Sequence, residues 1–145
     1  MSDASPHHTS PDHIGPSNAC KVADFHRAIG RQLPQRPAVP DAAELAFRMT
    51  LLAEEMAEVQ QAAAELKANL PGADVAGVFP LAHELIDLLY VAYGALLALG
   101  VDPDLAFAEI HRVNMHKVTW PRRADGKQLK PQRWRAADLR GVFET

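Results

Sequence analysis

The sequence predicts an all-α fold, a four-to-five-helix bundle, and three observations support that class. Ala and Leu are abundant, while aromatic residues make up 6% of the 145 residues, a composition that favours helices over strands. Apolar residues recur at alternating steps of three and four, which is the spacing of one helix face. Gly and Pro gather in short segments that separate these stretches and mark the connections between helices.

The first half of the chain predicts two helices. The first is expected over residues 18–29, because Gly30 provides a stop signal. A proline-rich linker follows. Asp41, with Glu44 three residues later, then has the pattern of an N-cap and its capping-box partner. The second helix is expected to continue from there to about Asn69, since no Gly or Pro interrupts it.

The second helix carries apolar side chains on two sides. Phe47, Leu51 and Ala62 fall on the side of the helical wheel opposite its main apolar stripe. A helix that is apolar on both sides contacts two partners, so this pattern suggests a homodimer. The main stripe, expected to face the bundle, consists of Leu45, Met49, Leu52, Met56, Val59, Ala63 and Leu66.

The second half of the chain predicts three more helices. Residues 81–99 are expected to form the third, which Gly100 ends. Asp102 is the expected N-cap of the fourth, which runs toward Lys117. A short last helix is expected over residues 136–143. No stretch of the sequence is a convincing strand.

Length and composition indicate one domain preceded by a tail. Residues 18–145 fit a single domain of the usual ~100–200 residues. Residues 1–17 are rich in Ser, Pro, His and Asp, which predicts a disordered tail. Cys20 is the only cysteine, which excludes an internal disulfide and fits a cytoplasmic protein. No membrane span is expected, because the longest uncharged run, 88–101, has 14 residues and a bilayer needs about 18–20.

Charge is distributed unevenly along the chain. Residues 1–111 hold 6 Lys/Arg and 15 Asp/Glu, whereas residues 112–145 hold 9 Lys/Arg and 3 Asp/Glu. An acidic helical body with a basic end suits a metal ion bound by one part and an anion held by the other. The alternative is that the basic end only neutralises the acidic body.

Two short groups of carboxylates give the strongest functional signal. Glu55 and Glu58 are three residues apart, as are Glu84 and Asp87. Residues at this spacing lie on one side of a helix, with Cβ atoms about 5–6 Å apart. Two such helices facing each other would form an oxygen-only site, which favours Mg²⁺ or Mn²⁺ over Zn²⁺ or iron.

The surroundings of the second pair strengthen this interpretation. Between Pro80 and Val101, the only charged residues are Glu84 and Asp87. Their neighbours in this stretch are apolar or aromatic, except for His83. A helix that is apolar all round is expected in the core, where an unpaired carboxylate costs several kcal/mol. A bound metal ion is therefore the expected counter-charge. His83 is beside Glu84 and is expected to support or pack against the site without binding the metal.

Two alternatives to a metal site remain open. A buried arginine such as Arg48 or Arg112 could pair with Glu84 and Asp87. The glutamates of the second helix also lie opposite its main apolar stripe, where a solvated face would place them.

The combined pattern resembles a known family. Glu55-x-x-Glu58 followed by Glu84-x-x-Asp87 resembles the metal signature of the all-α nucleoside triphosphate pyrophosphohydrolases, a superfamily that includes MazG-like enzymes and dimeric dUTPases. The resemblance is closest to the deinococcal MazG-like, dUTPase-related branch. The other similar segments are residues 25–30, 82–90, 107–114 and 122–131.

The resemblance implies both an activity and roles for the carboxylates. It implies a helical homodimer that converts a (d)NTP and water to a (d)NMP and pyrophosphate, with two or three Mg²⁺ or Mn²⁺ ions per site. The preferred substrate is expected to be dUTP or a related pyrimidine triphosphate, and the close alternative is broader house-cleaning of damaged nucleotides in the nucleotide pool. Glu55, Glu58, Glu84 and Asp87 would hold the ions. Glu54 would orient or deprotonate the attacking water, with a metal contact also open to it, and Glu54 and Glu55 could exchange roles.

Seven residues are expected to contact the substrate. Asn114 and Lys117 are three residues apart on the fourth helix and can reach one ligand; the resemblance implies the sugar or base at Asn114 and a phosphate at Lys117. The alternatives are a favourable charge at the helix C-terminus for Lys117, a solvated loop for Arg122 and Arg123, and a core position for Phe25. The remaining candidates are Arg122, Lys127 and Lys130 for the β- and γ-phosphates, and Phe25 and His26 beside the base.

Two non-enzymatic functions also stay open. A nucleic-acid-binding module would use the basic end together with Trp120 and Trp134. A plain helical interaction domain would only pair its carboxylates with arginines. The nucleic-acid interpretation leaves Glu84 and Asp87 unexplained, so we expect no stable nucleic-acid partner.

Overall fold

The computed structural model describes residues 15–72, 74–118, 121–130 and 134–144. The predicted N-terminal tail lies almost entirely outside these residues. Within them, the only extended pairing is an isolated bridge between Arg122 and Gln128, and the all-α prediction is confirmed. Two 3₁₀ helices, Leu70–Gly72 and Val75–Val78, connect the second and third of five α-helices: α1 (Asn18–Ala28), α2 (Ala42–Asn69), α3 (Phe79–Ala98), α4 (Pro103–Met115) and α5 (Leu139–Phe143).

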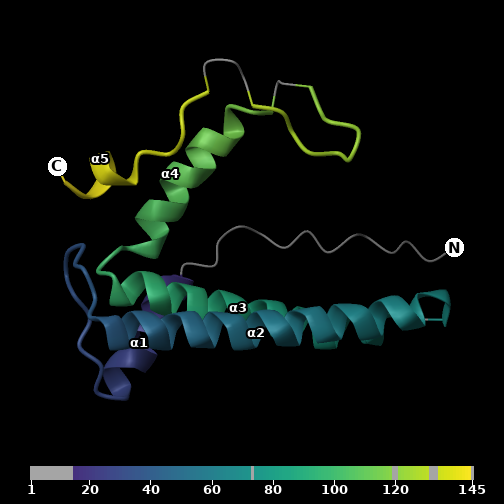
Figure 1. Ribbon diagram of the computed structural model, residues 1–145, viewed down its shortest axis with the longest axis horizontal. Helices are drawn as coiled ribbons and strands as arrows, with labels where there is room; N and C mark the ends of the chain where they lie inside the picture. The colour runs from purple at the N-terminus through teal and green to yellow at the C-terminus, as the bar shows by residue number, and fades with distance from the viewer. Residues whose placement is uncertain (1–14, 73, 119–120, 131–133, 145) are drawn as a thin grey trace, which may run out of the picture.

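The long helices α2 and α3 form the body of the molecule. They lie side by side and run in opposite directions, and α1 packs against α3 near one end (Figure 1). Helix α4 leaves this layer at an angle and contacts both α3 and α5. The segment after α4 runs back above the long pair (Figure 1).

Local signals set the ends of the helices. The carboxylate of Asp41 accepts a hydrogen bond of 2.7 Å from the N–H of Glu44 at the start of α2. Gly30 and Gly100 follow α1 and α3 with φ of +78° and +68°. A Cβ at Gly100 would lie 2.0 Å from the carbonyl oxygen of Arg36, so the connection from α3 to α4 requires glycine here.

The later caps explain where α4 and α5 begin. Asp102 accepts hydrogen bonds from the N–H groups of Asp104 and Leu105, as predicted for the start of α4. Asp138 accepts from the N–H of Gly141. Helix α5 therefore begins at residue 139, three residues later than the sequence predicts.

The packed face of α2 is rotated from the predicted one. Its buried residues are Arg48 and Ala62. On a helical wheel with Leu45 at 0°, these two average about −80°, whereas the predicted stripe is centred near −10°, a rotation of about 70°. Leu45, Met49 and Met56 consequently remain about half exposed.

The prediction that α3 is a core helix is wrong for the single chain. Gly94 is its only buried residue. Ile86 is 61% exposed and Leu89 about half exposed, because α1 and α2 cover only one side of the helix. Glu84 and Asp87 are accordingly half-buried, and the single chain does not enclose them in an apolar core.

One helical stretch, Val75–Ala98, is long and apolar enough to cross a membrane by length and composition. The expectation that no segment spans a membrane was based on the uncharged run 88–101 alone, which is shorter than this stretch. Glu84 and Asp87 lie inside this stretch. A charged carboxylate near the middle of a bilayer costs about 2.5–3.5 kcal/mol on insertion scales, so these two residues disfavour a position in lipid.

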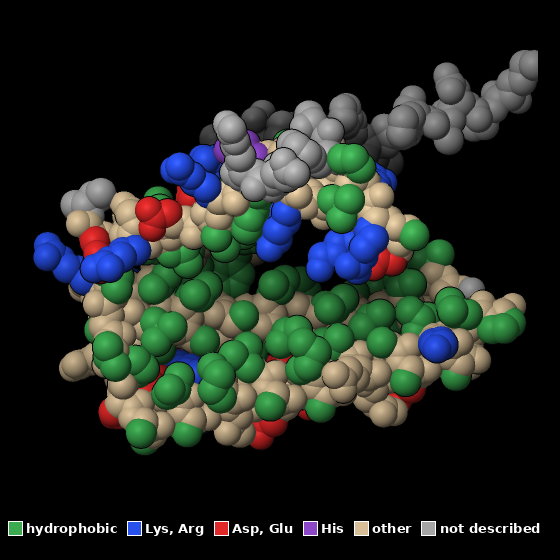
Figure 2. All heavy atoms as spheres, turned by 45° about the horizontal axis from the view of Figure 1, so that its top comes forward, with side chains coloured by type: hydrophobic (Ala, Val, Ile, Leu, Met, Phe, Trp, Pro, Cys, Tyr) green, Lys and Arg blue, Asp and Glu red, His purple; other side chains and the backbone are tan. Residues whose placement is uncertain are grey.

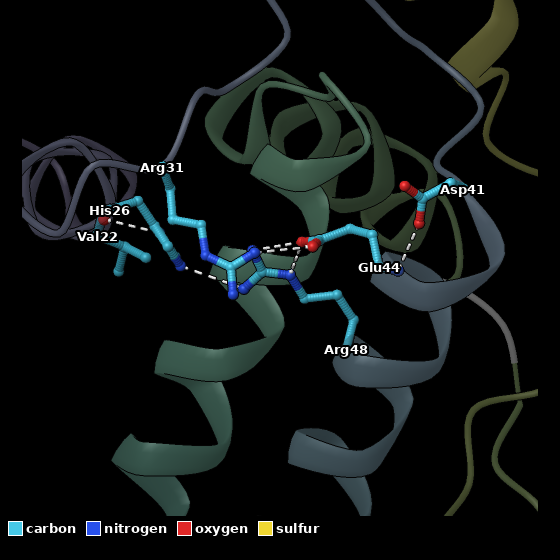
Figure 3. A network of polar contacts seen from close by, with 6 residues as sticks. All are labelled: Val22, His26, Arg31, Asp41, Glu44 and Arg48. Atoms are coloured by element: carbon cyan, nitrogen blue, oxygen red, sulfur yellow. Dashed lines mark hydrogen bonds and ion pairs between the residues drawn. The ribbon is translucent and has the colours of Figure 1, made fainter.

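A polar network fills the contact between α1 and α2 (Figure 3). Nδ1 of His26 lies 3.0 Å from the carbonyl oxygen of Val22, and Nε2 lies 3.2 Å from a guanidinium nitrogen of Arg48. Arginine can only donate, so Nε2 accepts and the neutral imidazole carries its proton on Nδ1. Burial, followed by the positive charge of Arg48, lowers the pKa of His26 from its usual 6.5.

Glu44 extends this network to the linker before α2. Its carboxylate accepts from Arg48 at 2.7 Å and from Arg31 at 2.9 Å (Figure 3). The predicted capping box is therefore half formed. The main-chain N–H of Glu44 bonds to Asp41, but its side chain pairs with two arginines, which are stronger partners than a single backbone N–H.

Candidate metal centre and anion pocket

Three carboxylates of α2 and α3 converge on one point. Glu55, Glu58 and Glu84 each place an oxygen so that the three atoms lie within 4.8 Å of one another. Glu55 and Glu58 are one turn apart on α2, and Glu84 comes from the neighbouring α3. Glu58 is exposed and the other two are half-buried. The structure thus brings together three of the predicted metal ligands.

The other two predicted carboxylates border this cluster. Asp87 lies near enough to Glu55 to raise its pKa, and Glu54, which is exposed, does so more weakly. The Oδ2 atom of Asp87 lies 3.2 Å from Nε2 of His83, one turn earlier on α3. The His83 side chain is 71% exposed, so it contacts a predicted ligand and is not a packing residue.

Among the described residues, no lysine or arginine offsets the negative charge of the cluster. Burial first, and then the carboxylates of Glu58, Asp87, Glu84 and Glu54, raise the pKa of Glu55 above its usual 4.5. Among the ion pairs of the described residues, none joins a lysine or arginine to these five groups.

The two arginines considered as alternative partners are engaged elsewhere. Arg48 pairs with Glu44 at 2.7 Å, and Arg112 pairs with Glu109 at 2.7 Å. Neither arginine is therefore the counter-charge of Glu84 and Asp87, so the alternative in which Arg48 or Arg112 pairs with them is wrong.

The donor set fits a small, hard cation. Three carboxylate oxygens within 4.8 Å of one another are close enough for one ion to be held by all three after side-chain adjustment, and hard divalent cations take oxygen ligands of this kind. Oxygen-only ligation suits Mg²⁺ or Mn²⁺, so a divalent ion would supply the missing positive charge.

A second group of predicted residues lines a pocket of about 400 Å³ after α4. The chain folds back there as a turn. The N–H of Arg123 donates to the carbonyl of Lys127 at 2.8 Å, and the N–H of Leu129 donates to the carbonyl of Pro121 at 3.0 Å. The pocket is lined by Asn114, Lys117, Val118, Arg122, Lys127 and Gln128. Four of the seven predicted substrate contacts therefore share one pocket.

The cations of this pocket lack acidic partners. In the described part of the chain, no ion pair includes Lys117, Arg122 or Lys127. The nearest polar contacts are neutral: Nζ of Lys117 donates to Oδ1 of Asn114 at 2.5 Å, and Nε of Arg122 donates to the amide oxygen of Gln128 at 3.3 Å. Positive charge without a counter-ion suits the binding of an anion. We call this space, lined by Asn114, Lys117, Val118, Arg122, Lys127 and Gln128, the anion pocket.

The remaining substrate candidates lie outside the lining of this pocket. Lys130 places Nζ 4.2 Å from the ring centroid of Trp134. Phe25 is about half exposed and contacts the rings of His26 and Tyr90, each at 5.8 Å between centroids, and His26 is buried in the α1–α2 network. The contact of Phe25 and His26 with a base stays a prediction.

Sequence reasoning did not predict two contacts at these sites, that of His83 with Asp87 and that of Trp134 with Lys117. The spacing of four between His83 and Asp87 is itself a signal of a contact on one helix face. The approach of Trp134 to Lys117, at 4.9 Å from Nζ to the ring centroid, joins segments that no local pattern relates.

The fold and the carboxylate cluster define a class, namely all-α proteins that can hold a divalent cation between two antiparallel helices. The chain belongs to the phosphoribosyl-ATP pyrophosphohydrolase family, whose model matches residues 22–114, well over half of the sequence. The match includes all five carboxylates and Asn114 and ends before the basic turn. No curated protein matches the chain as a relative.

Family membership confirms the predicted superfamily of MazG-like all-α nucleoside triphosphate pyrophosphohydrolases. It supports a pyrophosphohydrolase that acts on nucleotide-like substrates, from a family that is typically dependent on divalent metal ions. The dUTPase-related branch stays a prediction.

Proposed function

We propose that the protein is a Mg²⁺- or Mn²⁺-dependent nucleoside triphosphate pyrophosphohydrolase that cleaves between the α- and β-phosphates and prefers dUTP. The observation that carries the proposal is the convergence of Glu55, Glu58 and Glu84 within 4.8 Å, inside the segment that matches the family. Phosphoribosyl-ATP, after which the family is named, is the second substrate to test.

Each carboxylate has a role in this proposal. Glu55, Glu58, Glu84 and Asp87 hold two or three divalent ions, and Glu54 orients or deprotonates the attacking water from its exposed position beside Glu55. Bound divalent ions supply positive charge to the phosphate oxygens and acidify water. Burial first, and then the neighbouring carboxylates, raise the pKa of Glu55. A bound cation would offset the repulsion among these carboxylates, which supports ion binding at this point.

The anion pocket serves the leaving group. Lys117, Arg122 and Lys127, with Lys130 near them, offer donors to the β- and γ-phosphates, while Asn114 is within reach of the sugar or base. Figure 2 shows Lys and Arg side chains on the overhanging part of the molecule above a hollow whose floor is hydrophobic. In this proposal the bound nucleotide contacts the carboxylates of α2 and α3 with one end and the basic segment with the other.

The test is a screen of all common (d)NTPs and phosphoribosyl-ATP, with pyrophosphate and single phosphate resolved as products. The expected result is pyrophosphate release that requires Mg²⁺ or Mn²⁺ and is fastest with dUTP. Glu58→Gln and Asp87→Asn should each lower kcat by about 10²-fold or more, since each removes a charge from the metal centre. Glu65→Gln is the matched control, because it removes the same charge from an exposed position on α2. Wild-type turnover in both variants would reject the metal assignment.

We further propose that the protein is a homodimer. Large apolar side chains remain exposed on α2, α3 and α4, among them Met49, Ile86 and Phe107. A surface of this kind requires cover. A second copy of the chain is favoured over lipid because Glu84 and Asp87 interrupt the apolar surface of α3.

The main competing function is nucleic-acid binding by the basic segment. It predicts oligonucleotide affinity that falls steeply with salt. We expect no stable complex, because the lysines and arginines of the pocket line a space of about 400 Å³, which suits a small anion. Tight oligonucleotide binding together with no pyrophosphate release would favour the competing function.

A further inference from the structure

We propose that Trp134 is a positioning residue of the anion pocket, whose indole ring holds the ammonium groups of Lys117 and Lys130 where one polyphosphate can contact both. The inference rests on the proposed function, since it deepens the role of the same pocket. Nζ of Lys117 lies 4.9 Å from the ring centroid and Nζ of Lys130 lies 4.2 Å from it. Both distances are within the ~6 Å range of cation–π attraction.

The ring of Trp134 attracts two cations that repel each other. Lys117 follows the end of α4, whereas Lys130 lies beyond the turn, and both bring a positive charge to one place. Two ammonium groups repel each other, and in the described residues neither has a carboxylate partner. The electron-rich face of an indole attracts both cations without neutralising them, which leaves their charge available to an anion.

The indole N–H does not account for the presence of tryptophan. Nε1 of Trp134 is buried and has no hydrogen-bond partner among the described residues. Buried tryptophans usually find an acceptor for this group. The contacts that Trp134 makes with the two lysines are therefore made by its ring, and phenylalanine should preserve much of what leucine would remove.

The effect of the ring reaches the pocket through Lys117. This residue lines the pocket, touches Trp134 with its ammonium group, and donates from the same group to Oδ1 of Asn114 at 2.5 Å. A side chain held from two directions loses less conformational freedom when an anion binds. Loss of the ring should therefore weaken anion binding and leave the chemistry at the carboxylates intact.

The test uses the full-length chain in EDTA at low salt, where the metal centre does not contribute, with inorganic triphosphate as the probe in calorimetric titrations. Trp134→Leu should raise the Kd for triphosphate roughly threefold to tenfold, because the two lysines lose the ring that orders their ammonium groups before the anion binds. Trp134→Phe should stay within about twofold of wild type. With Mg²⁺ and a nucleotide substrate, Trp134→Leu should raise KM by a similar factor and change kcat by less than about twofold.

Other results would overturn the inference. An unchanged Kd for Trp134→Leu would do so, as would a wild-type chain that does not bind triphosphate. If Trp134→Leu fails to fold, Trp120→Phe leaves Trp134 as the only tryptophan, whose fluorescence can be excited selectively. Its emission should then change on triphosphate addition with the midpoint found by calorimetry, and constant emission would also overturn the inference. Triphosphate binding that depends on Trp134, without pyrophosphate release by wild type, would reject the proposed reaction and uphold this inference.

Discussion

Glu55 of α2 and Glu84 of α3 hold carboxylate oxygens within 4.8 Å of each other across the contact between the two helices. In the described part of the chain, no basic side chain forms an ion pair with either. Like charges at this range repel more strongly in a partly buried setting than in water. The metal-free fold therefore carries a cost at its proposed site, which links folding stability to metal binding.

Divalent metal should stabilise the folded protein. Mg²⁺ or Mn²⁺ at about 100 times its Kd would raise the free energy of unfolding by about 2.7 kcal/mol, because the ion binds only where the fold brings α2 and α3 together. The thermal midpoint, followed by circular dichroism with and without EDTA, measures the effect.

Substitutions test whether this stabilisation arises at the carboxylates. Glu84→Gln should abolish most of the metal-dependent rise in midpoint, whereas Glu65→Gln, which lies away from the cluster on α2, should retain it. A rise that persists at full size in Glu84→Gln would place the metal somewhere else.

The pH dependence of the metal-free protein should report the same repulsion. Because burial and then Glu58 raise the pKa of Glu55 in the folded state, the folded chain keeps a proton at a pH where the unfolded chain has lost it. This contribution to stability is full below about pH 4.5 and is lost as pH rises through the folded-state pKa. Glu55→Gln should remove that loss of stability and raise the thermal midpoint in EDTA at pH 7 by about a degree or two, since partly exposed pairs are weak. Urea unfolding at pH 4 to 7 measures the loss of free energy of unfolding with pH. A Glu55→Gln protein that is less stable than wild type at pH 7 would contradict the prediction.

Local chemistry made most of the fold predictable. Asp41 and Gly100 act within one helix turn of the ends they define, so their meaning is readable from the sequence. The packed face of α2 was not readable, because the apolar pattern does not distinguish a contact within the chain from one with a second chain. Leu45 and Met49 follow the expected period, yet both remain about half exposed in the single chain.

The candidate site divides in the same way. The spacing of three between Glu55 and Glu58 and between Asn114 and Lys117 is a local feature, and the structure brings the members of each pair together, although Lys117 lies two residues past the end of α4 and not on it as predicted. The contact of Lys117 with Trp134 depends on the path of the chain after α4. No periodicity encodes such a contact, so the sequence indicated a basic segment with its tryptophans but not the contact between Lys117 and Trp134.

Gly94 of α3 should not tolerate a side chain. A Cβ at this position would lie 2.7 Å from Cε1 of His26 and 3.4 Å from a guanidinium nitrogen of Arg48. Hydrogen bonds hold both partners in place. Overpacking costs about 1–3 kcal/mol, which should exceed the gain of about 1 kcal/mol from a better helix former. Gly94→Ala should therefore lower the free energy of unfolding, whereas Gly72→Ala, with open space around its Cβ, should change it little. A Gly94→Ala protein as stable as wild type would mean that the His26 ring can move aside.

Protonation of His26 should destabilise the fold in mild acid. Its pKa is lowered by burial first and then by Arg48. The hydrogen bond to the carbonyl of Val22 opposes this lowering, and the smaller effects of Arg31, which lowers the pKa, and Glu44, which raises it, follow. Between the folded-state pKa and 6.5, the unfolded chain binds a proton that the folded chain does not, so stability falls as pH drops through this window. His26→Gln should flatten this part of the stability profile, measured by urea unfolding from pH 7.5 to 5. The exposed change His111→Gln should leave the slope as in wild type, and an equal slope in His26→Gln would assign the effect to other groups.

A single charge on the exposed side of α3 should separate the proposed dimer. Ile86 is 61% exposed in the single chain and lies between the two carboxylates of the proposed metal centre in sequence. If a second copy covers this side, Ile86→Asp buries an unpaired carboxylate at the interface, which costs several kcal/mol. Sedimentation of wild type should give twice the chain mass, and Ile86→Asp should shift the mass toward that of one chain at micromolar concentration. Val39→Asp introduces the same charge on a linker residue that is 97% exposed, and it should leave the mass unchanged. A wild-type chain that sediments as a monomer, or that stays dispersed only with detergent or lipid vesicles, would show that a second copy is not what covers α3.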